Sequence, residues 1–250
     1  AFQMSFAAPL TVYVYDSFPV EIQTALTNQM KAHDIELKFR TFPSSEMAIT
    51  AILQEGAKTE ADIILGIDNY LPMNNPIFPQ LAPLDQTLAA PLESFVSFDE
   101  RLLPYDWGYI CLNYDSEKLA NPPKTLQDLT KPEYAKSIVL ENPESSSVGR
   151  AFMVFTADYF QDEQKFVEFW RGVAPNIFTV TGGWSDAYFG IYAKGEAPIV
   201  LSYSSSPVYH KMFENTERYK NLILDGTAPM QIETAGVLVS SSQPKEAQLF

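Results

Sequence analysis

Two hydrophobic periodicities alternate along the first seventy residues, and this alternation limits the possible fold more than any other feature. Residues 10–15 have the alternating, β-branched pattern of a strand, and residues 20–33 have helical spacing. A strand is expected next at 36–42, then a helix at 46–55 and an almost wholly apolar strand at 61–67. The pattern predicts a doubly wound α/β unit with its functional residues at the carboxyl ends of the strands.

Further strands and helices follow. Strands are expected at 105–114, 137–141, 197–203 and 231–240, and helices at about 149–159, 162–171 and 185–194. We expect the chain to pass from one lobe to the other in the strand at 105–114, and we therefore divide it into a first lobe at 9–104 and a second lobe at 105–205. Residues 206–250 are expected to return to the first lobe.

The charge of the chain limits its partners. Its 250 residues carry a net charge of −14, which disfavours nucleic acid and anionic membrane surfaces as partners. A cationic ligand is compatible with this charge. The single cysteine, Cys111, lies in an apolar strand-like run and is interpreted as a small buried hydrophobic residue.

Both ends of the chain resemble parts of longer segments. Residues 1–9 are similar to the tail of a secretory signal, with Ser5 and Ala7 as the small residues before a cleavage site. Residues 243–250 have the pattern of the first turns of a helix. We therefore expect the sequence to be a fragment that is truncated at its C-terminus.

Aromatic rings and carboxylates meet where the first and third strands end. Tyr15 and Asp16 are interpreted as a ring and a carboxylate that contact a ligand, although Asp16 or Ser17 could instead cap the following helix. Asp68 and Asn69 follow the third strand, where both residue types also form ordinary turns.

Hydroxyl groups and rings gather in the second half of the chain. Ser145, Ser146 and Ser147 precede a helix whose N-terminus would suit a phosphate, while helix capping alone needs only one serine. Trp184 follows two glycines, where it either faces a ligand cation or packs in a core.

Tyr203, Tyr209 and His210 flank a serine-rich turn. They are interpreted as an aromatic clamp or, alternatively, as ligands of a ferric ion, and His210 by itself is expected to be a hydrogen-bonded structural residue. The sequence has no nucleophile elbow, phosphate loop or dinucleotide fingerprint, so a binding protein is favoured over an enzyme.

Several stretches, in this order, resemble the periplasmic thiamine-binding proteins of bacterial ABC importers. They are LTVYVYDSF (10–18), ADIILGIDN (61–69), PYDWGY (104–109), LANPPKTL (119–126), TVTGGWSDAY (179–188) and VLSYSSSPVYH (200–210). The resemblance covers residues 9 to 250. It implies a type II periplasmic-binding fold, α/β and two-lobed, in which each lobe is a mixed sheet flanked by helices and the lobes close around the ligand.

The resemblance also implies a ligand and its contacts. Thiamine, or its mono- or diphosphate, is the implied ligand of a periplasmic monomer that needs no cofactor and serves a membrane permease. The strand ends and the resemblance together give the expected ligand-binding residues Tyr15, Asp16, Ser44, Asp68, Ser145, Ser146, Ser147, Trp184, Tyr203 and Tyr209. No catalytic residue and no metal site are implied.

The chain departs from the family pattern at three places before Phe250. Its loop after the first strand is short, and Ser44 and Ser45 stand where an acidic residue is common. In the serine loop, Glu144 and Val148 stand where arginine and proline are common. Two alternatives to thiamine capture stay open. One is a ferric-ion-binding protein of the same fold, and the other is a thiamine-converting enzyme, for which Cys111 is the only thiol.

Overall fold

The computed structural model describes residues 8–89 and 99–250 and divides the chain into two compact units. The first unit contains the chain up to Asp106 together with Ile232–Phe250, and the second contains Trp107–Gln231. The chain crosses between the units inside strands β4 (Leu103–Asp115) and β9 (Met230–Val237). The proposed cleavage site around Ser5 and Ala7 lies outside the described residues.

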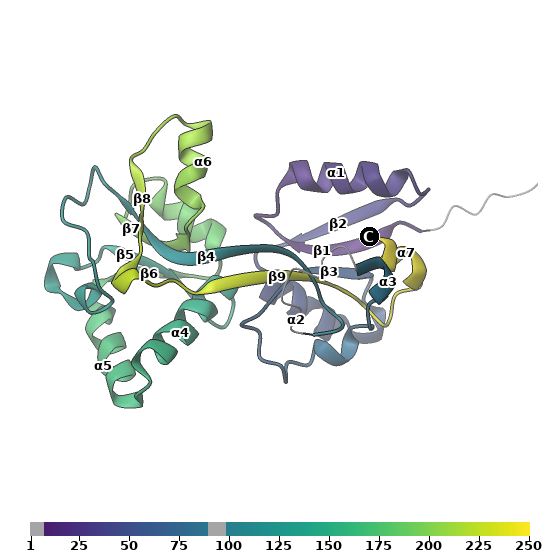
Figure 1. The fold of residues 1–250 in the computed structure, drawn as a ribbon, viewed down its shortest axis with the longest axis horizontal. Helices are drawn as coiled ribbons and strands as arrows, with labels where there is room; N and C mark the ends of the chain where they lie inside the picture. Colours follow the sequence, from purple (N-terminus) through teal and green to yellow (C-terminus); the bar gives the residue numbers. More distant parts are fainter. Residues whose placement is uncertain (1–7, 90–98) are drawn as a thin grey trace, which may run out of the picture. The chain divides into compact units, whose positions relative to one another are not determined.

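The sheet of the first unit has the strand order β2-β1-β3-β9 (Figure 1). Strands β1 (Leu10–Tyr15), β2 (Leu37–Phe42) and β3 (Ile63–Asp68) are parallel, and β9 pairs with β3 in the antiparallel direction. The parallel strands end at one common edge, which collects the residues that follow β1, β2 and β3.

Helices cover both faces of this sheet, as the alternation along β1 predicts. Leu10, Val12 and Val14 pack on the side of helix α1 (Val20–Lys31). Tyr13 points to the opposite side and packs with helix α2 (Ser45–Glu55). Figure 1 shows α1 and α2 on opposite faces. Among the described residues of this unit, the other elements are the 3₁₀ turns Gly56–Lys58 and Phe78–Gln80 and the helices α3 (Gln86–Ala89) and α7 (Pro244–Leu249).

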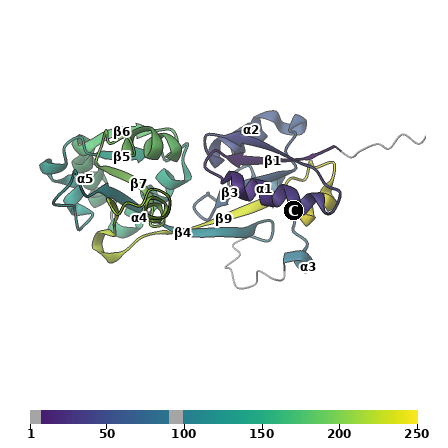
Figure 2. The ribbon, with the colours of Figure 1, turned by 90° about the horizontal axis from the view of Figure 1, so that it is seen from above.

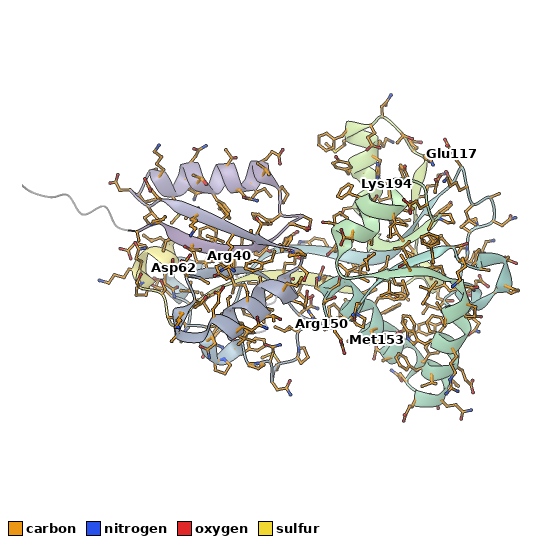
Figure 3. The ribbon with its side chains drawn as sticks, turned by 180° about the vertical axis from the view of Figure 1, so that it is seen from behind. Arg40, Asp62, Glu117, Arg150, Met153 and Lys194 are labelled. Atoms are coloured by element: carbon orange, nitrogen blue, oxygen red, sulfur yellow. The ribbon has the colours of Figure 1, made fainter. Side chains whose placement is uncertain are left out.

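Asp62 fastens the amino ends of these strands. Its carboxylate accepts a hydrogen bond of 2.8 Å from the Thr11 backbone N–H and one of 2.6 Å from the Ser241 hydroxyl. Figure 3 labels Asp62 in this unit. These hydrogen bonds stabilise the amino ends of the strands, opposite the carboxyl edge where the loops after β1, β2 and β3 lie.

The second unit has a mixed sheet of order β8-β4-β7-β5-β6. Figure 2 labels β4, β7, β5 and β6 of this sheet, and Figure 1 labels β8. Its parallel strands are β5 (Ile138–Glu141), β6 (Ile177–Thr181) and β7 (Ile199–Tyr203), while β4 is antiparallel to β7 and to β8 (Tyr219–Leu222). Its α-helices are α4 (Ser147–Phe160), α5 (Glu163–Val173) and α6 (Ser206–Phe213), and Asp186–Tyr192 form a π-helix. Short 3₁₀ turns complete the unit at Gln127–Thr130, Pro132–Tyr134, Ala174–Asn176 and Leu224–Gly226.

The fold class predicted from the sequence is confirmed, since each unit is a mixed sheet with helices packed on it. One boundary differs from the expectation. Residues 206–231 lie in the second unit instead of returning to the first, because β8 hydrogen-bonds to β4 there. None of the helices in the described part of the chain is long and apolar enough to cross a membrane.

Candidate functional site

The sequence-predicted residues of the first unit lie where its parallel strands end. Tyr15 is the last residue of β1, Ser44 caps the helix after β2, and Asp68 is the last residue of β3. The parallel pairing of β1 with β2 and β3 brings these positions to one edge of the sheet. This is the edge at which open α/β sheets bind their ligands.

The ring of Tyr15 lies over a glycine in the neighbouring strand. Gly66 has φ +94° at a bulge of β3, and a Cβ atom there would lie 2.8 Å from Tyr15 Cδ1 and 2.9 Å from Ser45 Cβ. No larger residue fits without moving the ring or the strand. The bulge therefore fixes a partly exposed tyrosine at the end of the sheet.

A buried hydrogen-bond cluster holds the hydroxyl group of Tyr15. The hydroxyl donates to Glu233 Oε2 at 2.5 Å, and the Tyr105 hydroxyl donates to the same oxygen at 3.0 Å. The pKa of Glu233 is raised to about 7, and burial is the largest cause. The nearby Asp106 and Asp68 also raise this pKa, while the hydrogen bonds from the two tyrosines lower it. The edge thus carries a carboxyl group whose charge changes near neutral pH.

Sequence reasoning missed Tyr105 and Glu233. Glu233 is 218 residues from Tyr15 in the chain, and it reaches the edge only because β9 pairs with β3, with Glu233 opposite Asp68. A signal for Tyr105 was present, because it stands in the PYDWGY stretch (104–109) that supports the family resemblance.

Asp16 does not cap the helix that follows it. The N-cap of α1 is Pro19, and no side chain bonds there, so the capping alternative for Asp16 and Ser17 is wrong. Both residues are exposed in a turn closed by the Phe18 N–H and the Tyr15 carbonyl at 3.2 Å. Asp16 therefore lies next to Tyr15 at the carboxyl edge of the first sheet and does not cap α1.

Ser44 and Asp68 have structural tasks. The Ser44 hydroxyl accepts a hydrogen bond of 3.2 Å from the Met47 N–H and so caps α2. The Asp68 carboxylate is 1% exposed and accepts one of 3.0 Å from the Tyr70 N–H. The turn role expected for Asp68 is present, the capping role of Ser44 was not predicted, and ligand contact by either residue stays a prediction.

The loops after β5, β6 and β7 are joined at the carboxyl edge of the second unit. The Asn142 N–H donates to the Thr181 carbonyl at 2.9 Å, and the Ser145 hydroxyl donates to the Gly182 carbonyl at 2.8 Å. The Trp184 Nε1–H donates to the Ser202 hydroxyl at 2.8 Å. These bonds bring the serine segment, Trp184 and the end of β7 together, as the parallel pairing predicts.

The three serines before α4 have different tasks. Ser145 bonds to the Gly182 carbonyl, Ser146 caps α4 by accepting from the Gly149 N–H at 3.4 Å, and Ser147 is the buried first residue of the helix. A Cβ at Gly149 would lie 2.4 Å from the Glu141 carbonyl oxygen, so the first turn of α4 rests directly on the end of β5. A helix N-terminus with hydroxyl groups is a ready anion site.

A buried carboxyl group, Glu141, lies at the end of β5 beside this helix N-terminus. Its side chain is 3% exposed, and neither carboxyl oxygen has a hydrogen-bond partner within residues 8–89 and 99–250. Burial raises its pKa well above the ordinary value, which favours the uncharged acid over the carboxylate.

Trp184 is half-buried in an aromatic cluster. Its ring stacks on Tyr188 with centroids 5.0 Å apart and an interplanar angle of 22°, and it meets Tyr203 edge-on at 6.0 Å. The hydrogen bond to Ser202 fixes its orientation. The ring is therefore held in place, as an aromatic binding platform must be.

His210 is a structural residue, which confirms the expectation for it. It is 2% exposed, its Nε2 lies 2.8 Å from the Tyr188 hydroxyl, and its Nδ1 lies 2.6 Å from Glu214. Both ring nitrogens therefore already have hydrogen-bond partners. The part of the chain that the structure describes contains no cluster of three His, Cys, Asp or Glu side chains that could hold an ion.

The neighbouring Tyr209 is 47% exposed on α6, where it packs against Phe213 with ring centroids 5.0 Å apart. It belongs to the loop and helix that follow β7, on the same carboxyl edge as Tyr203.

Cys111 is 5% exposed, and burial raises its pKa to about 12. The prediction of a small buried hydrophobic residue is confirmed. A thiol with this pKa is almost wholly protonated at neutral pH and is a poor nucleophile.

The fold matches that of known solute-binding proteins. A solved "Periplasmic thiamin binding protein" superposes with a TM-score of 0.85 at 29% sequence identity, covering 96% of this chain and 75% of that one. Residues 68–220 match the family model "Bacterial extracellular solute-binding protein". The fold and this match define a solute-binding protein of the bacterial cell exterior and not an enzyme.

Similar proteins of known name identify a particular family of solute-binding proteins. The chain is 37% identical over 246 residues to the thiamine-binding periplasmic protein of Brucella abortus, covering 96% of this chain and 72% of the relative. It is 31% identical over 257 residues to that of Salmonella typhimurium, covering 98% of this chain and 76% of the relative. The chain belongs to the family of thiamine-binding periplasmic proteins, and it is a periplasmic protein.

Proposed function

We propose that the protein captures thiamine and delivers it to the permease of an ABC importer. The observation that carries the proposal is the match to the Brucella abortus protein, which extends over 96% of the chain and so includes the carboxyl edges of both units. The same proposal makes the protein a monomer in solution that needs no cofactor. Its ligands are thiamine and, with it, the mono- and diphosphate.

The chemistry of thiamine suits the residues at these edges. Thiamine has a permanently positive thiazolium ring, an aminopyrimidine ring with donors and acceptors, and a hydroxyethyl arm that can carry phosphate. Tyr15 and Trp184 offer rings for packing, and a cation over such a ring gains roughly 0.5–2 kcal/mol. Asp16 and Asp68 are the acidic members of the proposed set.

The serine segment is proposed as the phosphate end. The hydroxyl groups of Ser145 and Ser146 stand at the N-terminus of α4, where the helix dipole favours an anion, and the raised pKa of Glu141 favours its uncharged form. Tyr203 and Tyr209 complete the proposed set in the second unit.

Isothermal titration of the ligand-stripped protein with thiamine, its monophosphate and its diphosphate tests the proposal. Spermidine, a flexible cation without rings, is the matched control. We expect one-to-one binding of thiamine that is much tighter than any binding of spermidine. The absence of binding heat with all three thiamine forms would contradict the proposed function.

The ranking of the three forms tests the role of the serines separately. If a phosphate rests at α4, Ser146→Ala lowers the affinity for the monophosphate more than the affinity for thiamine itself. Equal losses of affinity for both ligands would contradict the assignment of the phosphate site to the N-terminus of α4.

A further inference from the structure

One carboxyl group joins three segments of the first unit. Glu233 on β9 accepts hydrogen bonds from Tyr15 at the end of β1 and from Tyr105 on β4, and the two hydroxyl oxygens are 3.3 Å apart. Tyr15 is the proposed ring-packing residue, so the group that holds its hydroxyl also sets the position of its ring.

The groups around Glu233 are tyrosines and acids. Its pKa responds to Tyr15, Tyr105, Asp106 and Asp68, with Asp68 directly opposite it in the register of β3 and β9. Burial and the two aspartates favour the protonated acid, and the tyrosine hydroxyl groups favour the carboxylate. With a pKa of about 7, about half of the ligand-free molecules carry a proton on Glu233 at pH 7.

We propose that Glu233 is the counter-charge for a cationic solute packed on Tyr15, and that binding of this cation releases the proton that Glu233 holds in the ligand-free protein. The inference rests on the proposed function, because it needs an organic cation as the solute. Glu233 acts through the Tyr15 hydroxyl and is a positioning residue, while Tyr15 makes the contact.

The direction of the pH dependence follows from the charges. A bound cation favours the ionised carboxylate and lowers the pKa of Glu233, so affinity increases as pH rises through about 7 and levels off above it. If binding requires the carboxylate, the affinity for thiamine rises about tenfold between pH 6 and pH 8. At pH 7, about half a proton is released for each thiamine bound.

Titration calorimetry with thiamine in two zwitterionic buffers of different ionisation enthalpy, PIPES and ACES, measures this proton release. We expect the binding enthalpy at pH 7 to differ between the buffers, and we expect Glu233→Gln to remove both this difference and the rise in affinity with pH. Glu163→Gln, an exposed site on α5, is the matched control and should behave as the wild type. Binding of thiamine with the same enthalpy in both buffers would overturn the inference and leave the proposed function standing.

A second variant distinguishes an effect on the protonation of Glu233 from a general loss of structure at the site. Tyr105→Phe removes one hydrogen bond that favours the carboxylate, so it should move the midpoint of the affinity profile to higher pH. A loss of affinity that is equal at every pH would indicate a structural role only.

A measurement without ligand keeps the two proposals distinguishable. Carbon-13 NMR of the Glu side-chain carboxyls, with the Glu233 signal assigned by Glu233→Gln, should show a titration near pH 7 in the ligand-free protein. Titration of this signal in the ordinary glutamate range would overturn the inference whether or not thiamine binds. Titration near pH 7 without any thiamine binding would contradict the proposed function, and the proton release with it.

Discussion

The indole Nε1–H of Trp184 donates a 2.8 Å hydrogen bond to the hydroxyl of Ser202, which in turn lies 2.8 Å from the hydroxyl of Ser206. Trp184 follows β6, Ser202 is in β7 and Ser206 begins α6. This chain of bonds joins the proposed aromatic platform to the strand and helix beside it.

Ser202→Ala should loosen this platform. Removing the hydroxyl leaves the indole N–H and the buried Ser206 hydroxyl each without one partner, which costs about 1–3 kcal/mol of unfolding free energy. We expect urea denaturation to show this loss and calorimetry to show weaker thiamine binding. Full affinity in a destabilised variant would mean that the orientation of Trp184 does not matter for the ligand.

Gly66→Ala should displace Tyr15. The new methyl group meets the Tyr15 ring and Ser45 at under 3 Å, and the backbone has φ +94°, so strain and crowding together cost about 2–5 kcal/mol. Thermal and urea unfolding measure the loss. Gly108→Ala, where a Cβ meets nothing within 4 Å, is the control and should change stability by about 0.5 kcal/mol or less. Equal effects of the two substitutions would contradict the packing described for Tyr15.

Arg218 holds a buried carboxylate in the second unit. Its guanidinium donates to Asp115 at 2.8 Å and 2.5 Å, and Asp115 is 1% exposed. Burial by itself would raise the pKa of Asp115, but the hydrogen bonds from Arg218 and from the Glu117 N–H lower it below its usual 3.8. The pair therefore stabilises the fold above about pH 4, and this contribution is lost as pH falls through the lowered pKa.

Arg218→Ala should cost about 3–5 kcal/mol at neutral pH because it leaves the Asp115 charge buried and unpaired. The same variant should lose less further stability on acidification than the wild type does. Urea denaturation at pH 7 and pH 3 measures both effects, with Lys211→Ala in an exposed ion pair as the control of little effect. Parallel pH profiles for the wild type and Arg218→Ala would contradict this assignment.

Cys111 should resist thiol reagents in the native protein. Its burial and its pKa of about 12 keep the thiol protonated and covered, so an aromatic disulfide reagent at pH 8 should label it only as fast as the protein unfolds. Labelling should become rapid in urea. Rapid native labelling would reopen the alternative of a thiol-dependent enzyme.

Local patterns predicted most of the elements. The predicted strand at 10–15 matches β1 in full, and the helix predicted at 46–55 differs from α2 by one residue at its start. Helix α6 was interpreted as a serine-rich turn, although Pro207 in its first turn suits a helix start. Strands β6 and β8 were missed because their alternation is short and partly polar.

The site was only partly accessible from the sequence. Parallel strands bring the residues after each strand to one edge, so Tyr15, Trp184 and the serines could be selected from pattern alone. The bond between Tyr15 and Glu233 depends on the register of β3 with β9, with a bulge at Gly66, and no local pattern encodes that register. The capping alternative for the serines before α4 is confirmed at Ser146, while the capping role of Ser44 was not predicted.

Calorimetric titration with thiamine of the wild type, Tyr15→Ala and Trp184→Ala tests the central claim most directly. The account predicts one-to-one binding to the wild type and a loss of affinity of tenfold or more in each variant (on the order of 1.4 kcal/mol), while circular dichroism shows that both remain folded. Unchanged affinity in both variants would contradict the assignment of these two rings to the thiamine site.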